Sequence, residues 1–352
     1  MAVKLADVAE RAGVSIATVS RVINGDKHMS VSKDTEERIW KCVNELGYRS
    51  SKSKSTKSVK TRNIGYILTQ AAESFSDDFF SRVIYGIEQE LIKTGNNLSF
   101  ASIVNDQKAS DQYNQVLSSG CDGIIFVGEI ECDLYQKLCA RFNNCLAIFD
   151  IQNEYSVDNV TLDFEKKVFE MVSRMIQYGH RRIAFIGGGG FFCTPEKLDL
   201  QSFYNYEGRL RGYLTALMVN DLPVEPEIIK DGQWRIEVAY ERMSEILDIA
   251  PRVTCVFAAG DKMAIGAMRA IQERGLLIPQ DISLAGFDDI EIARFLTPPL
   301  STVSYSKEEL GRTAVRKLLH RIDLQEKGEV LPYTKTMLPG EIVWRESVTD
   351  IT

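Results

Sequence analysis

The chain has 352 residues, of which 44% are hydrophobic and 26% are charged, a balance typical of a globular protein with two or three domains. No stretch approaches the roughly 18–20 unbroken apolar residues that a membrane-spanning helix needs, and the first residues lack the apolar core of a signal peptide. The seven cysteines include no CxxC pair, so we expect free thiols and a cytosolic protein. Membrane, fibrous and disulfide-rich secreted classes are excluded.

Charge is distributed unevenly along the chain, whose formal net charge is −7. Residues 1–62 hold 13 Lys and Arg against 7 Asp and Glu, whereas residues 63–352 hold 29 against 42. A basic head on an acidic body suggests that the head meets a polyanion while the body does something else. A solvated surface charged by chance is the alternative.

The sharpest change in composition falls at residues 50–62, SSKSKSTKSVKTR, which hold five serines, four lysines, one arginine and one apolar residue. We expect none of these side chains to be buried, so this basic segment is predicted to be a linker. Residues 1–49 and 63–352 then form the domains on either side.

Short apolar segments alternate with amphipathic segments in the 290 residues after the linker. One series of strands is predicted at NIGYIL, LSFASIV, DGIIFVG and CLAIFD, and a second at NVTLD, RIAFIGG, VTCVFAAGD and ISLAGFDD. Helices between such strands indicate βαβ units and a parallel sheet. The body is therefore predicted to be α/β, with two doubly wound lobes and a ligand bound at the carboxyl ends of the strands.

The segment LADVAERAGVSIATVSRVING has the features of a helix–turn–helix unit. Small and apolar residues at helical spacing mark one face of its first helix: Leu5, Val8, Ala9 and Ala12. Gly13 can supply the positive φ that ends this helix, and Ser15 is a suitable N-cap for a second helix. A third helix, capped by Ser32 and running to Gly47, completes a three-helix core.

The outer face of the second helix carries the chemistry of DNA recognition. Arg21 can pair bidentately with guanine O6 and N7, and Ile16 offers apolar surface to a thymine methyl. Neighbouring hydroxyl and amide groups can bond phosphates without reading sequence. The DNA-binding candidates are Ser15, Ile16, Ala17, Thr18, Ser20, Arg21, Asn24 and His28. A three-helix interaction module without nucleic acid is the alternative.

The run KLADVAERAGVSIATVSRVING resembles the opening of the lac-repressor/galactose-repressor family of bacterial transcription regulators. The resemblance continues through RRIAFIGG, DKMAIGAMRAIQERGLLIPQDISLAGFDD and TPPLSTV, and galactoside-type repressors look closest. It implies a helix–turn–helix domain joined to a two-lobed body like that of periplasmic binding proteins. The first lobe would take residues 63–161 and 305–334, and the second would take residues 162–304 and 335–352.

A sugar-sized ligand needs bidentate polar partners at fixed angles and an aromatic face against its ring. Residues of these types lie in loops or where strands end and helices begin. Phe79 and Phe80 are expected in the loop after the first strand, and the others are Asp150, Arg209, Trp234 and Asp288. The family resemblance implies that the two aspartates and Arg209 bind hydroxyl groups in an effector cleft and that Trp234 stacks on the ring. Tyr305, near a crossover between the lobes, matches another cleft position.

Each of these residues also has a purely structural interpretation. An aspartate that ends a strand is usually a helix cap, which applies to Asp150 more than to Asp288, because Asp289 can cap in its place. Arg209 would otherwise be a solvated surface residue, and Trp234 would be half-buried packing.

Three segments add detail to the family resemblance. Gly260 stands before Asp261 where the family often carries Asn, so one potential hydroxyl contact is missing. Residues 187–190 are four glycines without a following GK[ST], which indicates a cleft edge and not a phosphate cradle. The linker lacks the leucine of the family's hinge helix and offers only Val59 as an aliphatic wedge.

The predicted function is a repressor of a sugar-utilisation operon, with galactose or a galactoside as the favoured effector. The predicted partners are palindromic double-stranded operator DNA, the sugar and a second copy of the chain, because no leucine heptads of a tetramer follow EIVWRESV. We expect no cofactor, metal or catalytic residue, since the three histidines have no metal-ligand spacing. The alternatives are a solute-binding or sugar-processing protein of the same body fold and a purine-type regulator that needs a corepressor.

Overall fold

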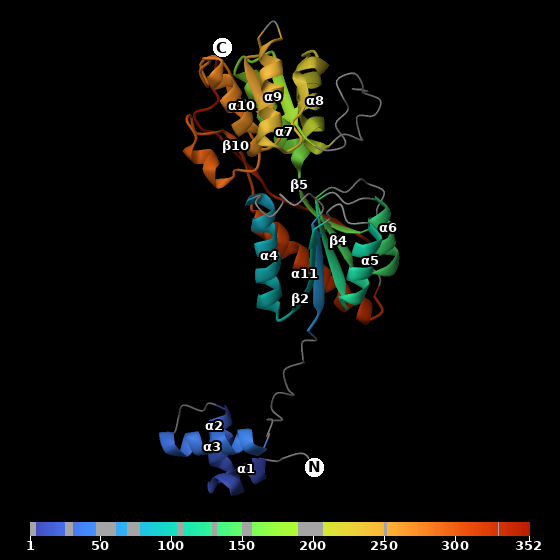
Figure 1. Cartoon of the computed structure of the whole chain (residues 1–352), viewed down its shortest axis with the longest axis vertical. Helices are drawn as coiled ribbons and strands as arrows, with labels where there is room; N and C mark the ends of the chain where they lie inside the picture. Colours follow the sequence, from blue (N-terminus) through green and yellow to red (C-terminus); the bar gives the residue numbers. More distant parts are fainter. Residues whose placement is uncertain are drawn as a thin grey trace. The chain divides into compact units, whose positions relative to one another are not determined.

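The computed structural model describes residues 5–24, 31–46, 61–68, 78–103, 109–128, 132–149, 157–188, 207–249, 252–329 and 331–352 (Figure 1). The chain divides into two compact units, Met1–Lys60 and Thr61–Thr352, which we call the head and the body. Among the described residues, no helix is both long and apolar enough to cross a membrane.

The head contains the three predicted helices, α1 (Leu5–Ala12), α2 (Ile16–Asn24) and α3 (Lys33–Leu46). Gly13 has a φ of +65°, so the predicted left-handed residue at the end of α1 is confirmed. Small and apolar side chains of the three helices face inward, and the buried core is formed by Val8, Ala9, Ala12, Val19, Ile39, Cys42 and Val43. The periodicity of the sequence thus predicts this unit well.

The first lobe of the body is a six-stranded parallel sheet with the order β11-β5-β4-β3-β1-β2. Its strands are β1 (Asn63–Leu68), β2 (Asn97–Ile103), β3 (Gly123–Val127), β4 (Cys145–Ile148), β5 (Asp158–Leu162) and β11 (Lys335–Leu338). Its helices are α4 (Asp78–Thr94), α5 (Ala109–Ser118), α6 (Cys132–Arg141) and α11 (Lys307–Glu326).

Both faces of this sheet are covered, as a doubly wound sheet requires. Strand β3 shows the alternation: Ile124 and Phe126 pack with residues of α5 and α6, whereas Ile125 and Val127 pack with residues of α4 and α11. Figure 1 shows these two helix pairs on opposite sides of the strands. A strand buried on both faces has no polar side, which explains why GIIFV is uniformly apolar.

The second lobe is a four-stranded parallel sheet with the order β7-β6-β8-β9. Its strands are β6 (Ile183–Gly187), β7 (Ile229–Asp231), β8 (Cys255–Ala258) and β9 (Ser283–Ala285). Helices α7 (Phe164–Gln177) and α8 (Gly208–Val219) pack together, as do α9 (Ile236–Leu247) and α10 (Asp261–Glu273). The described part of the lobe also contains two short 3₁₀ helices, η5 (Pro226–Ile228) and η6 (Glu291–Phe295).

The described chain passes between the lobes at three places: after β5, after β10 (Thr302–Ser304) and after β11. β10 pairs antiparallel with β12 (Glu341–Val343). β11 pairs with β5 of the first lobe, with Leu338 opposite Leu162. The assignment of residues 335–352 to the second lobe was therefore wrong at its start, since the return crossing follows Leu338.

The linker prediction needs a correction at its last residue. Arg62 is only 5% exposed and forms ion pairs with Glu326 (2.5 Å) and Asp323 (3.1 Å) at the end of α11. Its backbone N–H also donates to Asn96 Oδ1 at 2.8 Å. Arg62 therefore belongs to the body, because its charge finds carboxylate partners far along the chain. Residues 50–60 lie outside the described residues.

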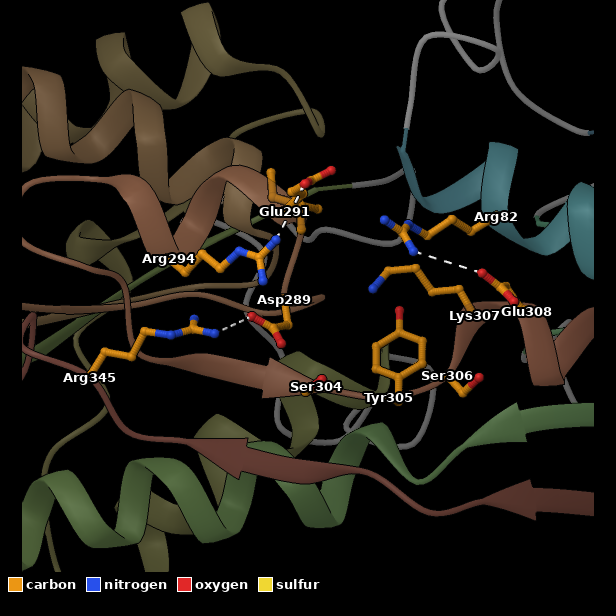
Figure 2. A pocket seen from close by; sticks show the side chains of 11 residues that line it. Arg82, Asp289, Glu291, Arg294, Ser304, Tyr305, Ser306, Lys307, Glu308 and Arg345 are labelled. Carbon is orange, nitrogen blue, oxygen red and sulfur yellow. Dashed lines mark hydrogen bonds and ion pairs between the residues drawn. The ribbon is translucent and has the colours of Figure 1, made fainter.

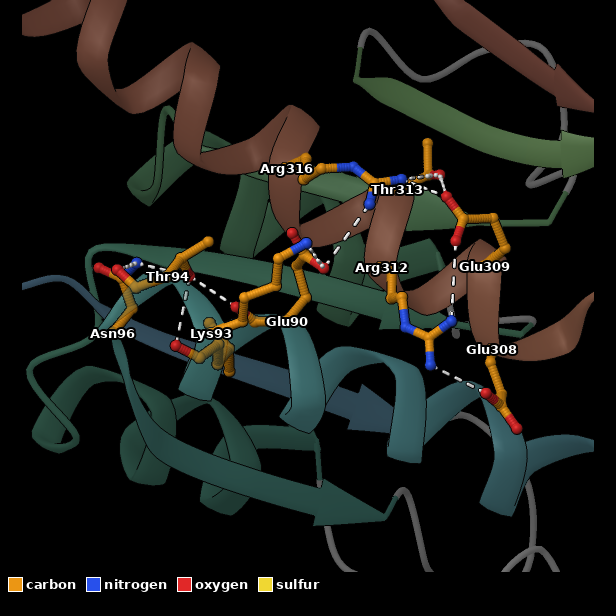
Figure 3. A network of polar contacts seen from close by, with 10 residues as sticks. Glu90, Lys93, Thr94, Asn96, Glu308, Glu309, Arg312, Thr313 and Arg316 are labelled. Carbon is orange, nitrogen blue, oxygen red and sulfur yellow. Dashed lines mark hydrogen bonds and ion pairs between the residues drawn. The ribbon is translucent and has the colours of Figure 1, made fainter.

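Helices α4 and α11 cross with their backbones in contact. A Cβ atom on Gly86 would lie 2.0 Å from the carbonyl oxygen of Glu308, and one on Gly311 would lie 2.2 Å from that of Val83. Charged side chains border this seam, and Figure 3 shows Arg312 joined to Glu308 among them. The two glycines are required because no side chain fits between the helices.

Substitution of Gly311 by alanine should lower the urea midpoint of the body's unfolding. Alanine has the higher helix propensity, worth roughly 1 kcal/mol, but overpacking a backbone contact costs about 1–3 kcal/mol and needs the helices to separate. His320→Ala, at an exposed position of the same helix, is the control and should be neutral. An unchanged midpoint for Gly311→Ala would show that α4 and α11 can separate to admit a methyl group without loss of stability.

Candidate functional site

The exposed side of α2 presents most of the residues predicted to bind DNA. Ile16 is 52% exposed, and Ala17 and Arg21 lie exposed one turn apart. The backbone N–H of Thr18 donates to Ser15 Oγ at 3.1 Å, so Ser15 caps the helix as predicted.

Three further candidates differ in how far the structure describes them. Ser20 is half-buried on α2. Asn24 ends α2, but its side chain lies outside the described residues, and so does His28. The roles of all these residues in DNA binding stay predictions.

The candidate ligand site of the body lies in the crevice between its two lobes, at the carboxyl ends of the strands. In each sheet the strand order reverses once, between β1 and β3 and between β6 and β8. Ligands bind at such reversal points in open α/β sheets because the loops there diverge. Arg209 follows β6 and Gly260 follows β8, so these residues flank the reversal point of the second lobe.

Aromatic rings form a continuous row from one lobe to the other. The ring centroids of Phe79 and Phe149 lie 5.0 Å apart, and those of Phe149 and Phe164 lie 5.5 Å apart. Phe287 is 5.6 Å from Phe164 and 5.9 Å from Tyr305. The row crosses the interface, since the first two rings belong to the first lobe and Phe164 begins α7 of the second.

The predicted position of Phe79 and Phe80 needs a correction. Phe79 and Phe80 lie in the first turn of α4 and not in a loop, with ring centroids 4.9 Å apart. Both pack against the main core of the body while remaining partly exposed. A helical position holds these rings more firmly than a loop would.

Arg209 is held at the centre of this crevice. Its Nε donates to Glu207 Oε1 and its Nη1 donates to the carbonyl oxygen of Ala259, both at 2.9 Å. The guanidinium carbon lies 4.4 Å from the ring centroid of Trp234, 4.8 Å from that of Phe164 and 5.4 Å from that of Phe287. Cation–π contacts with three rings orient the guanidinium plane.

Arg209 stays charged although its side chain is only 13% exposed. Burial by itself lowers the pKa of Arg209, but the charges of Glu207 and Asp288 outweigh this effect and raise the pKa. Among the described residues, Nη2 makes no hydrogen bond. Its two N–H groups are therefore the candidate donors of Arg209 to a ligand.

Two neighbouring side chains fix the orientation of Asp288 by hydrogen bonds. Tyr305 donates its hydroxyl proton to Asp288 Oδ1 at 2.6 Å, and Lys307 donates to the backbone carbonyl oxygen of Asp288. Burial and then the charge of Asp288 raise the pKa of Tyr305 well above its ordinary value, so the hydroxyl stays a donor. The predicted capping by Asp289 is not seen, since Asp289 pairs with Arg345 at 2.7 Å.

Backbone strain is concentrated around this crevice. Of the six described non-glycine residues with positive φ, five lie in its loops: Phe149, Gln233, Trp234, Asp288 and Asp289. Such conformations cost roughly 1–3 kcal/mol each and persist only where surrounding contacts determine them. The strain is consistent with loops shaped to aim side chains at a ligand.

Asp261 positions the loop that carries Asp288. Its carboxylate accepts from Thr302 Oγ1 at 2.7 Å and from the backbone N–H of Ile290 at 2.9 Å. Burial raises the pKa of the Asp261 carboxyl to about 8, and the nearby charge of Asp288 adds to the rise. Gly260, just before it, has extended backbone and leaves open the space between Asp288 and Trp234.

Gly188 explains one part of the glycine run. A Cβ atom on Gly188 would lie 2.6 Å from the backbone nitrogen of Trp234 and 2.9 Å from its indole ring. This glycine therefore lets the indole lie flat against the backbone after β6. Residues 189 and 190 lie outside the described residues.

The structure brings five predicted residues into one contact network: Phe79, Arg209, Trp234, Asp288 and Tyr305. Phe80 joins through Phe79, and Asp150 lies outside the described residues. Phe149, Phe164, Phe287 and Glu207 were not among the predicted site residues. A usable signal was present, because each of the three phenylalanines lies just after a predicted strand or within its last residues.

A helix–turn–helix head and a two-lobed body with a polar and aromatic crevice define a class of protein: DNA-binding regulators that respond to a small ligand. The family model described as bacterial regulatory proteins, lacI family, matches residues 4–51. The model for a periplasmic binding protein-like domain matches residues 172–348. The chain belongs to the lacI family and is a DNA-binding transcriptional repressor.

Relatives match over nearly the whole chain. The HTH-type transcriptional repressor PurR of Haemophilus influenzae (strain PittEE) is 31% identical over 348 residues, with 98% of each chain covered. The ribose operon repressor of Haemophilus influenzae (strain ATCC 51907 / DSM 11121 / KW20 / Rd) is 33% identical over 348 residues, with 97% of each chain covered. These relatives are repressors and not enzymes.

A solved structure of the lac repressor dimer bound to operator and the anti-inducer ONPF is 26% identical to this chain and has a TM-score of 0.70. The match covers 99% of this chain and 100% of the other. The predicted Lac-repressor-like architecture is thereby confirmed.

Proposed function

We propose that this repressor controls a sugar-utilisation operon and that its effector is a small sugar, with galactose or a galactoside favoured. The observation that carries the proposal is the pairing of Arg209 with a row of aromatic rings. Nη2 of Arg209 offers two donors, the nearby Asp288 offers carboxylate oxygens, and Trp234 with Phe164 offers apolar faces. Vicinal hydroxyl groups and the apolar side of a sugar ring suit this combination.

Gly260 favours a substituted sugar over a free monosaccharide. A Cβ atom at this position would lie 3.4 Å from Asp288 Oδ2 and 3.7 Å from the Trp234 ring. An asparagine, which the family often carries there, would fill this space with an amide. Its absence leaves room beside Asp288 for a substituent such as the second group of a galactoside.

A purine corepressor is the second candidate. The rings of Phe79, Phe149, Phe164 and Phe287 offer flat apolar surface on which a planar base would stack. The relative named PurR, at 31% identity, makes this chemistry worth testing beside sugars. A purine would use Arg209 as a donor to its ring nitrogens or carbonyl groups.

We also propose that the chain acts as a homodimer on a palindromic operator in the cytoplasm. Large apolar side chains lie exposed on α4 and η6, with Ile92 72% exposed and Phe295 66% exposed. Exposed apolar groups of this size suit an interface between two copies of the body. Two-fold symmetry of the dimer would require two operator half-sites.

The test is a thermal-shift panel of galactosides, other sugars and purines, followed by operator-binding assays with each compound that raises the melting temperature. We expect a galactoside to stabilise the full chain and to change its operator affinity. Stabilisation by purines alone would replace the sugar proposal with the second candidate. Stabilisation without any change in operator affinity would contradict ligand control through this site.

A further inference from the structure

A cavity of about 370 Å³ lies between the two lobes of the body, apart from the contact network of Arg209 (Figure 2). Its volume falls within the roughly 300–1,000 Å³ typical of small-molecule sites. Among its described lining residues it shares Tyr305 with the crevice of Arg209, but Arg209, Trp234 and Phe79 do not line it. Its chemistry is different, because four of its side chains are cationic.

Lys307 is the central feature of this cavity. The residue is only 5% exposed, and Figure 2 shows its side chain extending into the hollow. Its ammonium donates to the carbonyl oxygen of Asp288 and lies 4.9 Å from the ring centroid of Tyr305. No carboxylate pairs with it among the residues that the structure describes. An ammonium has three donors, so two remain for a ligand.

Three guanidinium groups from both lobes also line the cavity. Arg82 comes from α4 of the first lobe, whereas Arg294 and Arg345 come from the second. Arg294 pairs with Glu291 at 3.3 Å, but both side chains are more than half exposed, so water competes for this pair. The Nε of Arg82 is held by Asp78 at 3.1 Å, and its Nη1 reaches Glu308 only at 3.8 Å. Arg294 can therefore turn to an anion at little cost, and Arg82 can offer its terminal Nη groups while Asp78 holds its Nε.

The carboxylates of the lining do not cancel these charges. Asp289 is held by Arg345 at 2.7 Å. Glu308 has a closer partner in Arg312, at 2.9 Å, which lies outside the cavity (Figure 3). The N-terminus of the 20-residue helix α11, capped by Ser306, also borders the cavity and adds positive potential. Four cations against three carboxylates leave the site electropositive.

We propose that this cavity binds a small dianion, a phosphate monoester or a dicarboxylate, as a second ligand of the repressor. The ammonium of Lys307 and the guanidinium of Arg82 form the primary contacts, and Arg294 approaches from the other lobe. Phosphate and carboxylate oxygens match guanidinium donors bidentately. This inference goes beyond the proposed sugar effector and does not depend on it.

The two sites meet at Asp288. The carboxylate of Asp288 accepts the Tyr305 hydroxyl proton, whereas its carbonyl oxygen accepts from Lys307. A dianion that binds the Lys307 ammonium would compete with the backbone carbonyl oxygen of Asp288, whose side chain belongs to the sugar crevice. The test must therefore separate the two sites.

Isothermal titration calorimetry of the full chain, with inorganic phosphate and separately with succinate at constant ionic strength, tests the proposal. Lys307→Met should weaken binding at least about tenfold, and Lys307→Arg should restore most of it, because the charge is the determinant. Lys93→Met, which removes a 74% exposed lysine of α4, is the matched control and should bind like the parent. Arg209→Gln should also bind normally.

Each outcome decides the question. Binding of phosphate alone, of succinate alone or of both supports the dianion site and identifies its source. If Lys307→Met does not fold, Arg294→Gln at the exposed rim takes its place and should weaken binding about threefold. Absence of binding by both anions would overturn the proposal. Equal binding by all variants would overturn it as well, because the anion would then bind elsewhere, for example on the basic head. Loss of binding in Arg209→Gln would place the anion in the sugar crevice and overturn it too.

Discussion

Replacement of Arg209 by glutamine should abolish the effector's influence on operator binding, while operator affinity without effector stays close to that of the parent chain. The guanidinium supplies the free donors of the crevice and contacts three aromatic rings at once. Loss of a charged hydrogen bond costs about 1.5–3 kcal/mol, so effector affinity should fall by at least about tenfold. A ligand shifts an equilibrium only by its differential affinity for the two states, so this loss removes the switch.

The measurement pairs effector titration with operator binding in the presence and absence of effector. Arg182→Gln is the matched control, because Arg182 also forms a half-buried ion pair, with Glu225, but lies just before the amino end of β6. This control should keep the response. A normal response in Arg209→Gln would show that the ligand binds elsewhere, and loss of the response in both variants would indicate general damage to the second lobe.

The sequence predicts the architecture of this protein well, because its strands are apolar on both faces and its helices are amphipathic. The short strand β11 was not predicted, because KTML carries no apolar alternation and only its pairing with β5 determines its place. The burial of Arg62 was not predicted for a related reason. Its surroundings in the sequence are polar, while its carboxylate partners lie more than 260 residues away.

The candidate site was predictable in part for a physical reason. Polar and aromatic residues that follow strands meet at the carboxyl edge of a parallel sheet, so Arg209, Trp234 and Asp288 converge. The phenylalanines of the row carry the same signal, but their contacts could not be foreseen, since the contact of Phe149 with Phe164 joins two lobes through tertiary packing. The left-handed backbone of Phe149 is likewise set by its surroundings, because a phenylalanine does not favour it.

Replacement of Arg21 by alanine should weaken operator binding by about 1–3 kcal/mol per half-site, the range for a bidentate contact between an arginine and a guanine. Arg21 lies exposed on α2, one turn from Ala17, on the side of the helix opposite the buried Val19. Binding to random DNA rests on phosphate contacts and counterion release, and one charge contributes little to it. We therefore expect Arg21→Ala to lower the affinity for operator DNA strongly and the affinity for random DNA only slightly.

A gel-shift or fluorescence titration on both kinds of DNA, at several salt concentrations, measures this difference. Arg38→Ala, which removes the same charge from an exposed position of α3, is the control. Any effect of Arg38→Ala should be equal on operator and random DNA, since a contact with phosphate carries no sequence information. Arg21→Ala could instead lose the same affinity for operator and for random DNA, with a salt dependence reduced by about one counterion. That result would show that Arg21 binds phosphate and that the specificity of α2 comes from its apolar and hydroxyl side chains.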